Sequence, residues 1–147
     1  MLELLSPAGS PEAVIAAVQN GADAVYLGLG DFNARRGAKN FTNEEFEKAV
    51  TYCRVRGCKV YVTLNTLVND GEMGAAVDAA RLASSCGADG LIVQDLGLVS
   101  AIRRALPDIP LNASTQMSIH NLAGVQAAAE KGLTRAALAR DLSREQI

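Results

Sequence analysis

Four times along the chain, a predicted helix ends on a glycine and a run of apolar or β-branched residues begins just after it. The glycines are Gly21, Gly57, Gly87 and Gly132. A glycine that closes a helix immediately before a buried strand is the join that folds built from βα units use repeatedly. The pattern therefore predicts a chain in which strands and helices alternate from one end to the other.

The residues between these joins predict six strands and five helices. The strands are expected at 3–6, 24–29, 59–64, 90–94, 111–114 and 134–139. The helices are expected at 11–21, 43–57, 70–87, 96–106 and 119–131. Ser10 and Pro11 give the first helix a capped start, and Thr42 with Glu45 forms a capping box for the second.

The predicted strands are nearly continuous apolar runs, which is typical of parallel strands buried on both faces. An open doubly wound sheet and a (β/α) barrel both fit this pattern. We favour the barrel, because the same short glycine join recurs as a uniform winding requires. No G-x-G-x-x-G motif follows the first strand, so a Rossmann dinucleotide site has no support. The expected fold class is α/β, an incomplete (β/α) TIM-type barrel of about six parallel strands and five helices.

A complete eight-unit barrel takes about 250 residues, whereas this chain has 147. Ser143 and Gln146 form a further capping box, which predicts a sixth helix that the sequence does not supply. We therefore expect residues 1–147 to form one partial barrel domain, truncated relative to the full ring. Open edges at its first and last strands would favour self-association.

Composition narrows the function classes. The chain is 49% hydrophobic, yet no apolar run approaches the ~18 residues of a membrane span. The first residues do not resemble a signal peptide, so a cytoplasmic location without membrane contact is expected. A net charge of −2 argues against a nucleic-acid surface dominated by charge, although it permits a local basic patch. Three cysteines without close pairing, Cys53, Cys58 and Cys86, predict neither a disulfide framework nor a metal site.

Functional groups of a (β/α) barrel gather at the carboxyl ends of its strands. Arg35 and Arg36 lie in the long polar loop 30–41, where they are either an anion clamp or simply a solvated basic loop. We expect a polar mouth in which the substrate-binding residues are Arg35, Arg36, Asn40, Asn65, Thr115, Gln116 and Arg140. The same mouth is expected to include Ser6, Gly9, Tyr26, Asn33, Gln94, Asn121 and Asp141.

Candidate catalytic residues are His120, Asp95 and Ser114. His120 is the only histidine, and the other two could supply a carboxylate and a hydroxyl. No G-x-S-x-G or H-E-x-x-H motif accompanies them. Each also has a simpler interpretation: His120 caps or lines the mouth, Asp95 favours a helix N-terminus, and Ser114 satisfies loop backbone groups. The catalytic residues therefore stay unknown at this point.

Five segments together resemble the collagenase-like peptidases of unknown catalytic type, peptidase family U32. They are ELLSPAGSPE at 3–12, GADAVYLG at 21–28, FNARR with NF at 32–36 and 40–41, NASTQMSIHN at 112–121, and ARDLS at 139–143. In the last segment Asp141 stands where the family pattern leads us to expect glutamate. The resemblance covers essentially the whole chain, in order, and corresponds to the N-terminal part of the family's barrel.

The resemblance implies an activity and a cofactor. Members include peptidases, some of them collagenases, whereas other branches take part in oxygen-independent hydroxylation of RNA bases or of the ubiquinone ring. Those branches carry a cysteine set for an iron–sulfur cluster downstream of the matching region. We therefore expect no cofactor in this segment, and a cluster only in a longer protein that has the downstream cysteines.

Three functional hypotheses follow. The first is a peptidase of the collagenase-like family acting on a peptide. The second is a component of base or quinone hydroxylation, the only case in which nucleic acid would be a partner. The third is a barrel fragment that is catalytically inactive alone. The basic groups of the mouth would suit an anionic small molecule as well as a peptide.

Overall fold

The computed structural model describes residues 2–34 and 40–147, and it contains a six-stranded sheet whose strands follow one another in chain order. Every neighbouring pair is parallel. The strands are β1 (Leu5–Pro7), β2 (Ala24–Gly28), β3 (Lys59–Leu64), β4 (Gly90–Val93), β5 (Leu111–Ala113) and β6 (Arg135–Ala136). The predicted parallel core of six strands is confirmed.

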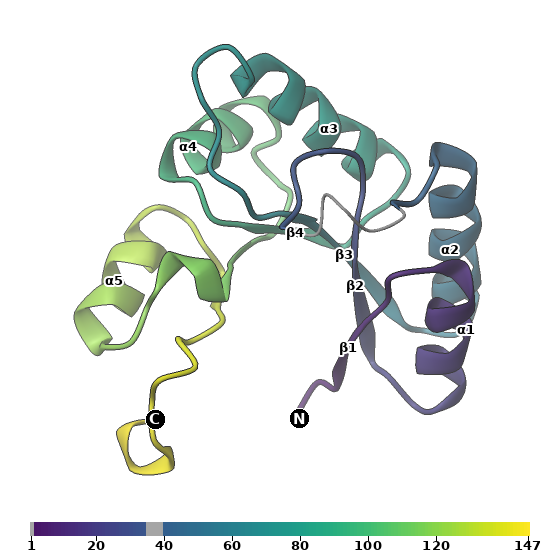
Figure 1. Cartoon of the computed structure of the whole chain (residues 1–147), viewed down its shortest axis with the longest axis horizontal. Coiled ribbons are helices and arrows are strands. Elements are labelled where there is room, and N and C mark those ends of the chain that lie inside the picture. Colours follow the sequence, from purple (N-terminus) through teal and green to yellow (C-terminus); the bar gives the residue numbers. More distant parts are fainter. Residues whose placement is uncertain (1, 35–39) are drawn as a thin grey trace.

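The helices lie on the outer side of a curled sheet, and the inner side is open between the two ends of the chain (Figure 1). They are α1 (Pro11–Gln19), α2 (Asn43–Val55), α3 (Met73–Ser85), α4 (Leu96–Ala105) and α5 (Leu122–Glu130). A doubly wound sheet would carry helices on both faces. The fold is therefore the predicted incomplete TIM-type barrel.

The four glycine joins share one geometry. Gly21, Gly57, Gly87 and Gly132 have φ angles of 88°, 70°, 95° and 78°, in the left-handed region that favours glycine. In each join the glycine N–H bonds to the carbonyl three residues earlier, and the next N–H bonds to the carbonyl five residues earlier. The same helix ending thus turns the chain into the next strand each time.

Two of these joins continue with the same Gly-Ala-Asp sequence, and the aspartate ties adjacent strands together. Asp23 accepts a hydrogen bond from the Leu4 N–H, and Asp89 accepts one from the Val60 N–H, both at 2.8 Å. Each carboxylate therefore holds the beginning of the preceding strand against the strand that follows the join.

The core lies between the sheet and the helices. Its largest fully buried side chains include Phe46, Leu64, Leu91, Leu98 and Ile102. Cys53 lies on the same buried face of α2 as Phe46, which stands about two helical turns earlier. Burial raises the pKa of the Cys53 thiol to about 12, so this cysteine behaves as a small apolar residue.

Several predicted boundaries are shifted by local capping. The helix expected from 70 begins at Met73, because Asn69 and Glu72 exchange side-chain hydrogen bonds at 3.1 Å ahead of it. The helix expected from 119 begins at Leu122, where the Asn121 side chain caps it.

Three further expectations are corrected in extent. The last predicted strand shrinks to Arg135–Ala136, and the first is observed at Leu5–Pro7. The capping box at Ser143 opens only a short 3₁₀ turn, Arg144–Gln146. Another 3₁₀ turn, Thr115–Met117, follows β5.

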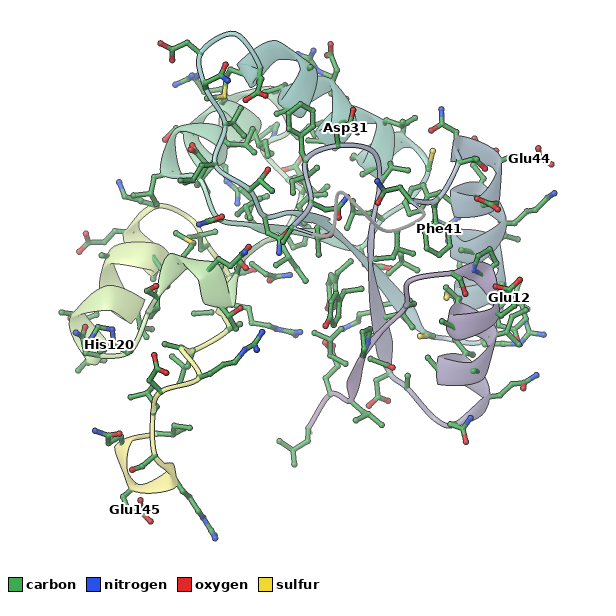
Figure 2. All side chains as sticks on the ribbon, viewed as in Figure 1. Glu12, Asp31, Phe41, Glu44, His120 and Glu145 are labelled. Carbon is green, nitrogen blue, oxygen red and sulfur yellow. The ribbon has the colours of Figure 1, made fainter. Side chains whose placement is uncertain are left out.

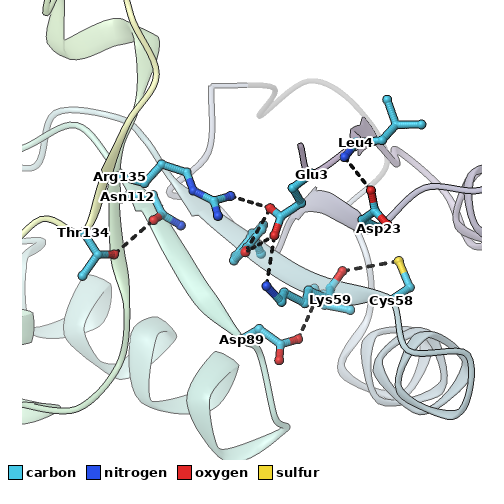
Figure 3. Close-up of polar contacts among 11 residues, drawn as sticks. Glu3, Leu4, Asp23, Cys58, Lys59, Asp89, Asn112, Thr134 and Arg135 are labelled. Atoms are coloured by element: carbon cyan, nitrogen blue, oxygen red, sulfur yellow. Dashed lines mark hydrogen bonds and ion pairs between the residues drawn. The ribbon is translucent and has the colours of Figure 1, made fainter. Parts of the chain in front are cut away.

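The inner side of the sheet is bridged near the amino ends of the strands by Glu3 (Figure 3). Its carboxylate pairs with Lys59 at 3.0 Å and with Arg135, and it accepts a bond from the Tyr61 hydroxyl at 3.3 Å. The bond from Arg135 holds the pKa of Glu3 at about 2, below its ordinary 4.5; burial acts in the opposite direction, and Lys59 reinforces the decrease. Glu3 therefore links the first strand segment to β3 and β6.

Glu3→Gln is expected to lower the free energy of unfolding by about 1–2 kcal/mol at neutral pH, since solvent screens the half-exposed Lys59 and Arg135. A carboxyl whose pKa falls on folding stabilises above its unfolded pKa. The parent should therefore lose this increment as the pH drops from about 4.5 to about 2, and the variant should not. Urea unfolding across pH measures it. Glu44→Gln, in an exposed pair with Lys48, is the control with little effect; equal losses in both variants would contradict the linking role.

β1 and β6 form the edges of the sheet in the described part of the chain, since each pairs on one side only. Self-association through these edges stays a prediction. Across the described residues, none of the helices has the length and hydropathy needed to traverse a bilayer.

Candidate functional site

A cavity of about 500 Å³ lies on the inner side of the sheet, towards the carboxyl ends of the strands. Consecutive strands each deliver residues to this rim because all of them run parallel, so their carboxyl ends meet at one edge. The lining residues are Leu5, Ala8, Gly9, Tyr26, Leu27, Gly28, Asn33, Ala34, Asn40, Phe41, Thr63, Asn65, Ile92, Ser114, Thr115, Gln116, Ala137 and Arg140.

The predicted substrate-binding residues converge on this cavity where the structure describes them. Asn40, Asn65, Thr115, Gln116 and Arg140 all line it. Arg35 and Arg36 lie outside the described residues. Residues from the loop after β2 thus meet residues that follow β3, β5 and β6. Their role in binding stays a prediction.

An amide network builds the wall nearest β2. Asn33 is only 2% exposed, and its Nδ2 donates to the Gly30 carbonyl at 2.7 Å and to Asn40 Oδ1 at 3.0 Å. Across the mouth, Asn65 Oδ1 accepts a bond from the Ala34 N–H at 3.0 Å. These contacts join both ends of the loop after β2 to the rim.

Gly28 makes room for this network. A Cβ at this position would lie 2.7 Å from Asn33 Cγ, closer than real Cβ contacts occur. Neither Gly28 nor Thr63 was among the site residues expected from the sequence. The Thr63 hydroxyl donates to the Leu27 carbonyl at 3.1 Å on the cavity floor. A glycine as the last residue of a strand, followed by asparagine five residues later, was the signal available for Gly28.

The three candidate catalytic residues do not form one constellation. Ser114 lines the cavity, with its Oγ accepting from the Gln116 N–H at 3.2 Å. Asp95 caps α4, accepting from the Leu98 N–H at 2.8 Å. His120 is exposed beside α5, its Nδ1 2.9 Å from the Ser118 carbonyl oxygen (Figure 2). Among the described residues no hydrogen bond joins the three, and a catalytic role for them stays a prediction.

The three cysteines of the described chain are not gathered as the ligands of an iron–sulfur cluster would be. Within ranges 2–34 and 40–147, no group of three or more His, Cys, Asp or Glu side chains is placed to hold a metal ion. Cys53 and Cys58 are buried, whereas Cys86 is half-buried.

Arg140 contributes a positive charge to the described lining of the cavity. No carboxylate belongs to the lining among the residues that the structure describes, so the other polar groups there are amides and hydroxyls. Tyr26 and Phe41 add aromatic surface. Among the described residues, the lining thus combines the Arg140 guanidinium with neutral hydrogen-bonding groups and flat apolar surface, an arrangement suited to a planar polar or anionic ligand.

Comparison with known proteins gives relatives of two kinds. The chain is 37% identical to the tRNA hydroxylation protein P1 of Bacillus subtilis (strain 168), over 99% of this chain and 34% of that protein. It is 38% identical to a 23S rRNA 5-hydroxycytidine synthase of Escherichia coli (strain K12), over 99% of this chain and 22% of that protein. It is also 35% identical to a collagenase of Porphyromonas gingivalis, over 81% of this chain and 28% of that protein. The chain spans about a third or less of the length of these relatives.

Solved structures agree on the fold. A U32 peptidase structure superposes with a TM-score of 0.72 at 17% identity, covering 94% of this chain and 58% of that one. A type I 3-dehydroquinate dehydratase from Clostridium difficile gives 0.66 at 12% identity, covering 97% and 62%. At such identities the likeness concerns the barrel alone. The family model described as peptidase family U32 matches residues 9–147, which confirms the resemblance drawn from the five sequence segments: the chain belongs to peptidase family U32.

Proposed function

We propose that this chain forms the substrate-binding half-barrel of a protein that hydroxylates RNA bases. The observation that carries the proposal is the rim cavity, in which amide, hydroxyl and guanidinium groups surround aromatic surface. The similarity to proteins named for tRNA and rRNA hydroxylation extends over 99% of the chain and supports the same function. Hydroxylation was the alternative function implied by the sequence resemblance. The relatives support it more than they support the peptidase function.

The cavity suits a nucleobase in size and chemistry. Ligand pockets of about 300–1,000 Å³ bury most of a small ligand, and this cavity holds about 500 Å³. Enzymes that modify a base inside RNA take it out of the stack and hold it by hydrogen bonds to its edge and by contact with aromatic faces. Asn65 and Arg140 would orient the edge of the base, while Tyr26 and Phe41 would contact its face.

In this proposal the cavity-lining residues bind and orient the base. Their part in the reaction is to hold one ring carbon of the base in place and to exclude water around it.

The test is complementation. The complete gene that encodes this chain is expressed in a bacterium that lacks its own tRNA or rRNA hydroxylation proteins. It is expected to restore hydroxylated nucleosides, detected by mass spectrometry of digested RNA. Arg140→Ala should lower their yield about tenfold or more, because it removes the one cationic group of the described lining. Arg104→Ala, at an exposed position on α4 away from the cavity, is the control and should keep the yield. RNA without hydroxylated nucleosides despite soluble expression would contradict the proposal.

A peptidase is the second candidate, favoured by relatives named collagenase and uncharacterized protease, the latter from Methanocaldococcus jannaschii at 36% identity. The protein purified from the complemented strain and incubated with gelatin distinguishes the peptidase from the hydroxylation function. Gelatin cleavage that disappears in Ser114→Ala would support the peptidase, whereas intact gelatin together with restored nucleosides would support hydroxylation.

A further inference from the structure

The orientation of two asparagine amides in the cavity wall is fixed by backbone groups. The Ala34 N–H can only donate, so the atom of Asn65 that faces it at 3.0 Å must be the oxygen. The Gly30 carbonyl can only accept, so the atom of Asn33 that faces it at 2.7 Å must be the nitrogen. Because Asn33 Nδ2 also faces Asn40 at 3.0 Å, the atom of Asn40 at that contact must be its oxygen. The usual ambiguity of amide flips is thereby removed.

This orientation leaves the NH₂ groups of Asn40 and Asn65 for a ligand. Asn40 and Asn65 line the cavity, and their NH₂ groups have no hydrogen-bond partner among the residues that the structure describes. An amide nitrogen of this kind donates two hydrogen bonds and accepts none. On these two side chains, the acceptor atoms are used within the protein while the donors remain for a ligand.

The neighbouring polar groups reinforce this donor character. Ser114 Oγ accepts the Gln116 N–H at 3.2 Å, which uses one of its two acceptor sites and keeps its hydroxyl hydrogen available as a donor. Arg140 carries donors only. Thr63 is the exception, since its hydroxyl hydrogen is used on the Leu27 carbonyl at 3.1 Å. The described lining contains no carboxylate that would accept from a ligand.

We propose that the cavity selects a ligand edge made of hydrogen-bond acceptors, carbonyl or carboxylate oxygens, and that Asn40 and Asn65 are the residues that set this preference. The inference rests on the rim cavity being the substrate site of the proposed function, and it adds the polarity of the ligand that fits there. A ring edge with two carbonyl oxygens matches the two NH₂ groups, whereas an edge that carries an amino group places donor against donor.

The experiment measures binding to the purified chain, and therefore does not depend on any hydroxylation activity. The probes are uridine, cytidine and succinate. Uridine carries two carbonyl oxygens on either side of its N3–H, cytidine has an amino donor in place of one carbonyl and an acceptor at N3, and succinate offers carboxylates alone. Uridine is expected to bind about tenfold more tightly than cytidine. Binding of succinate but not uridine would mean that the ligand's acceptor atoms are carboxylate oxygens. It would still support a cavity wall that presents hydrogen-bond donors, here called the donor wall.

The decisive variant is Asn65→Asp. Its carboxylate still accepts the Ala34 N–H, so the wall keeps its structure, but the cavity side changes from a donor to an acceptor. The preference for uridine over cytidine should be lost or reversed, and succinate binding should weaken about tenfold. Asn40→Asp should act in the same direction, because its oxygen can still accept from Asn33.

Asn121→Asp is the matched control. Its side chain accepts the Gly124 N–H at 2.8 Å in a similar manner, and it does not line the cavity, so it adds the same charge without changing the wall. Equal binding of uridine and cytidine to the parent, an unchanged ratio in Asn65→Asp, or binding of none of the three probes would overturn the inference. Restored RNA hydroxylation together with an unchanged ratio would reject the donor wall while leaving the proposed function intact.

Discussion

Gly28→Ala is expected to destabilise the chain by about 2–3 kcal/mol and to abolish ligand binding at the rim cavity. A Cβ at position 28 would lie 2.7 Å from Cγ, 2.8 Å from Nδ2 and 2.9 Å from Oδ1 of Asn33. Asn33 is 2% exposed and short, so it cannot move aside while keeping its bonds to Gly30 and Asn40. Breaking these bonds leaves buried polar groups unpaired, at about 1–3 kcal/mol. Urea unfolding and uridine titration measure the two effects.

Gly9→Ala is the matched control for this prediction. Gly9 lines the same cavity, but a Cβ there would meet no atom within 4 Å. Its stability should stay within about 0.5 kcal/mol of the parent. If Gly28→Ala were as stable as Gly9→Ala and bound uridine equally well, the role assigned to the Gly28–Asn33 contact would be wrong.

Arg103→Ala is the second substitution with a large expected effect, about 2–4 kcal/mol of lost stability. From α4, the Arg103 guanidinium donates to the carbonyls of Pro107, Ile109 and Gly132 at 2.7, 3.0 and 2.8 Å. It therefore ties the end of α4 and the turn before β5 to the glycine that closes α5. Hydrogen bonds from a charged donor contribute about 1.5–3 kcal/mol each when well shielded, and the partial exposure here reduces the sum.

Thermal and urea unfolding of Arg103→Ala provide the measurement. Arg81→Ala is its control, because Arg81 pairs with Asp78 in an exposed position on α3, where such pairs contribute about 0–1 kcal/mol. Comparable losses in the two variants would show that the three carbonyl contacts of Arg103 contribute no more than a surface ion pair.

The sequence was sufficient for the architecture because the relevant signals are local. The glycine joins, the capping box at Thr42 and the apolar strands all depend on residues within a few positions of one another, and all are observed. Convergence of Asn65, Gln116 and Arg140 at one rim also followed, since parallel strands place their carboxyl ends together.

The side-chain contacts that determine the chemistry of the site could not be predicted from local sequence patterns. The polarity of Asn65 depends on a backbone N–H at Ala34, and the pairing of Glu3 depends on Arg135, at the other end of the chain. Such contacts require the fold. His120 lies away from the cavity for a similar reason: the chain turns through Thr115–Met117 before Asn121 caps α5, and a pattern of apolar spacing does not specify that turn.

The central claim, that the carboxyl-end rim holds the ligand, is tested most directly by NMR of the isotope-labelled chain titrated with uridine. We expect shifts in the side-chain amide signals of Asn40 and Asn65 and in the backbone signals of Thr115 and Gln116. The signals of Lys59, Asn112 and Arg135, at the opposite end of the strands, should stay unchanged. Shifts confined to that opposite end, with the rim amides unmoved, would contradict it.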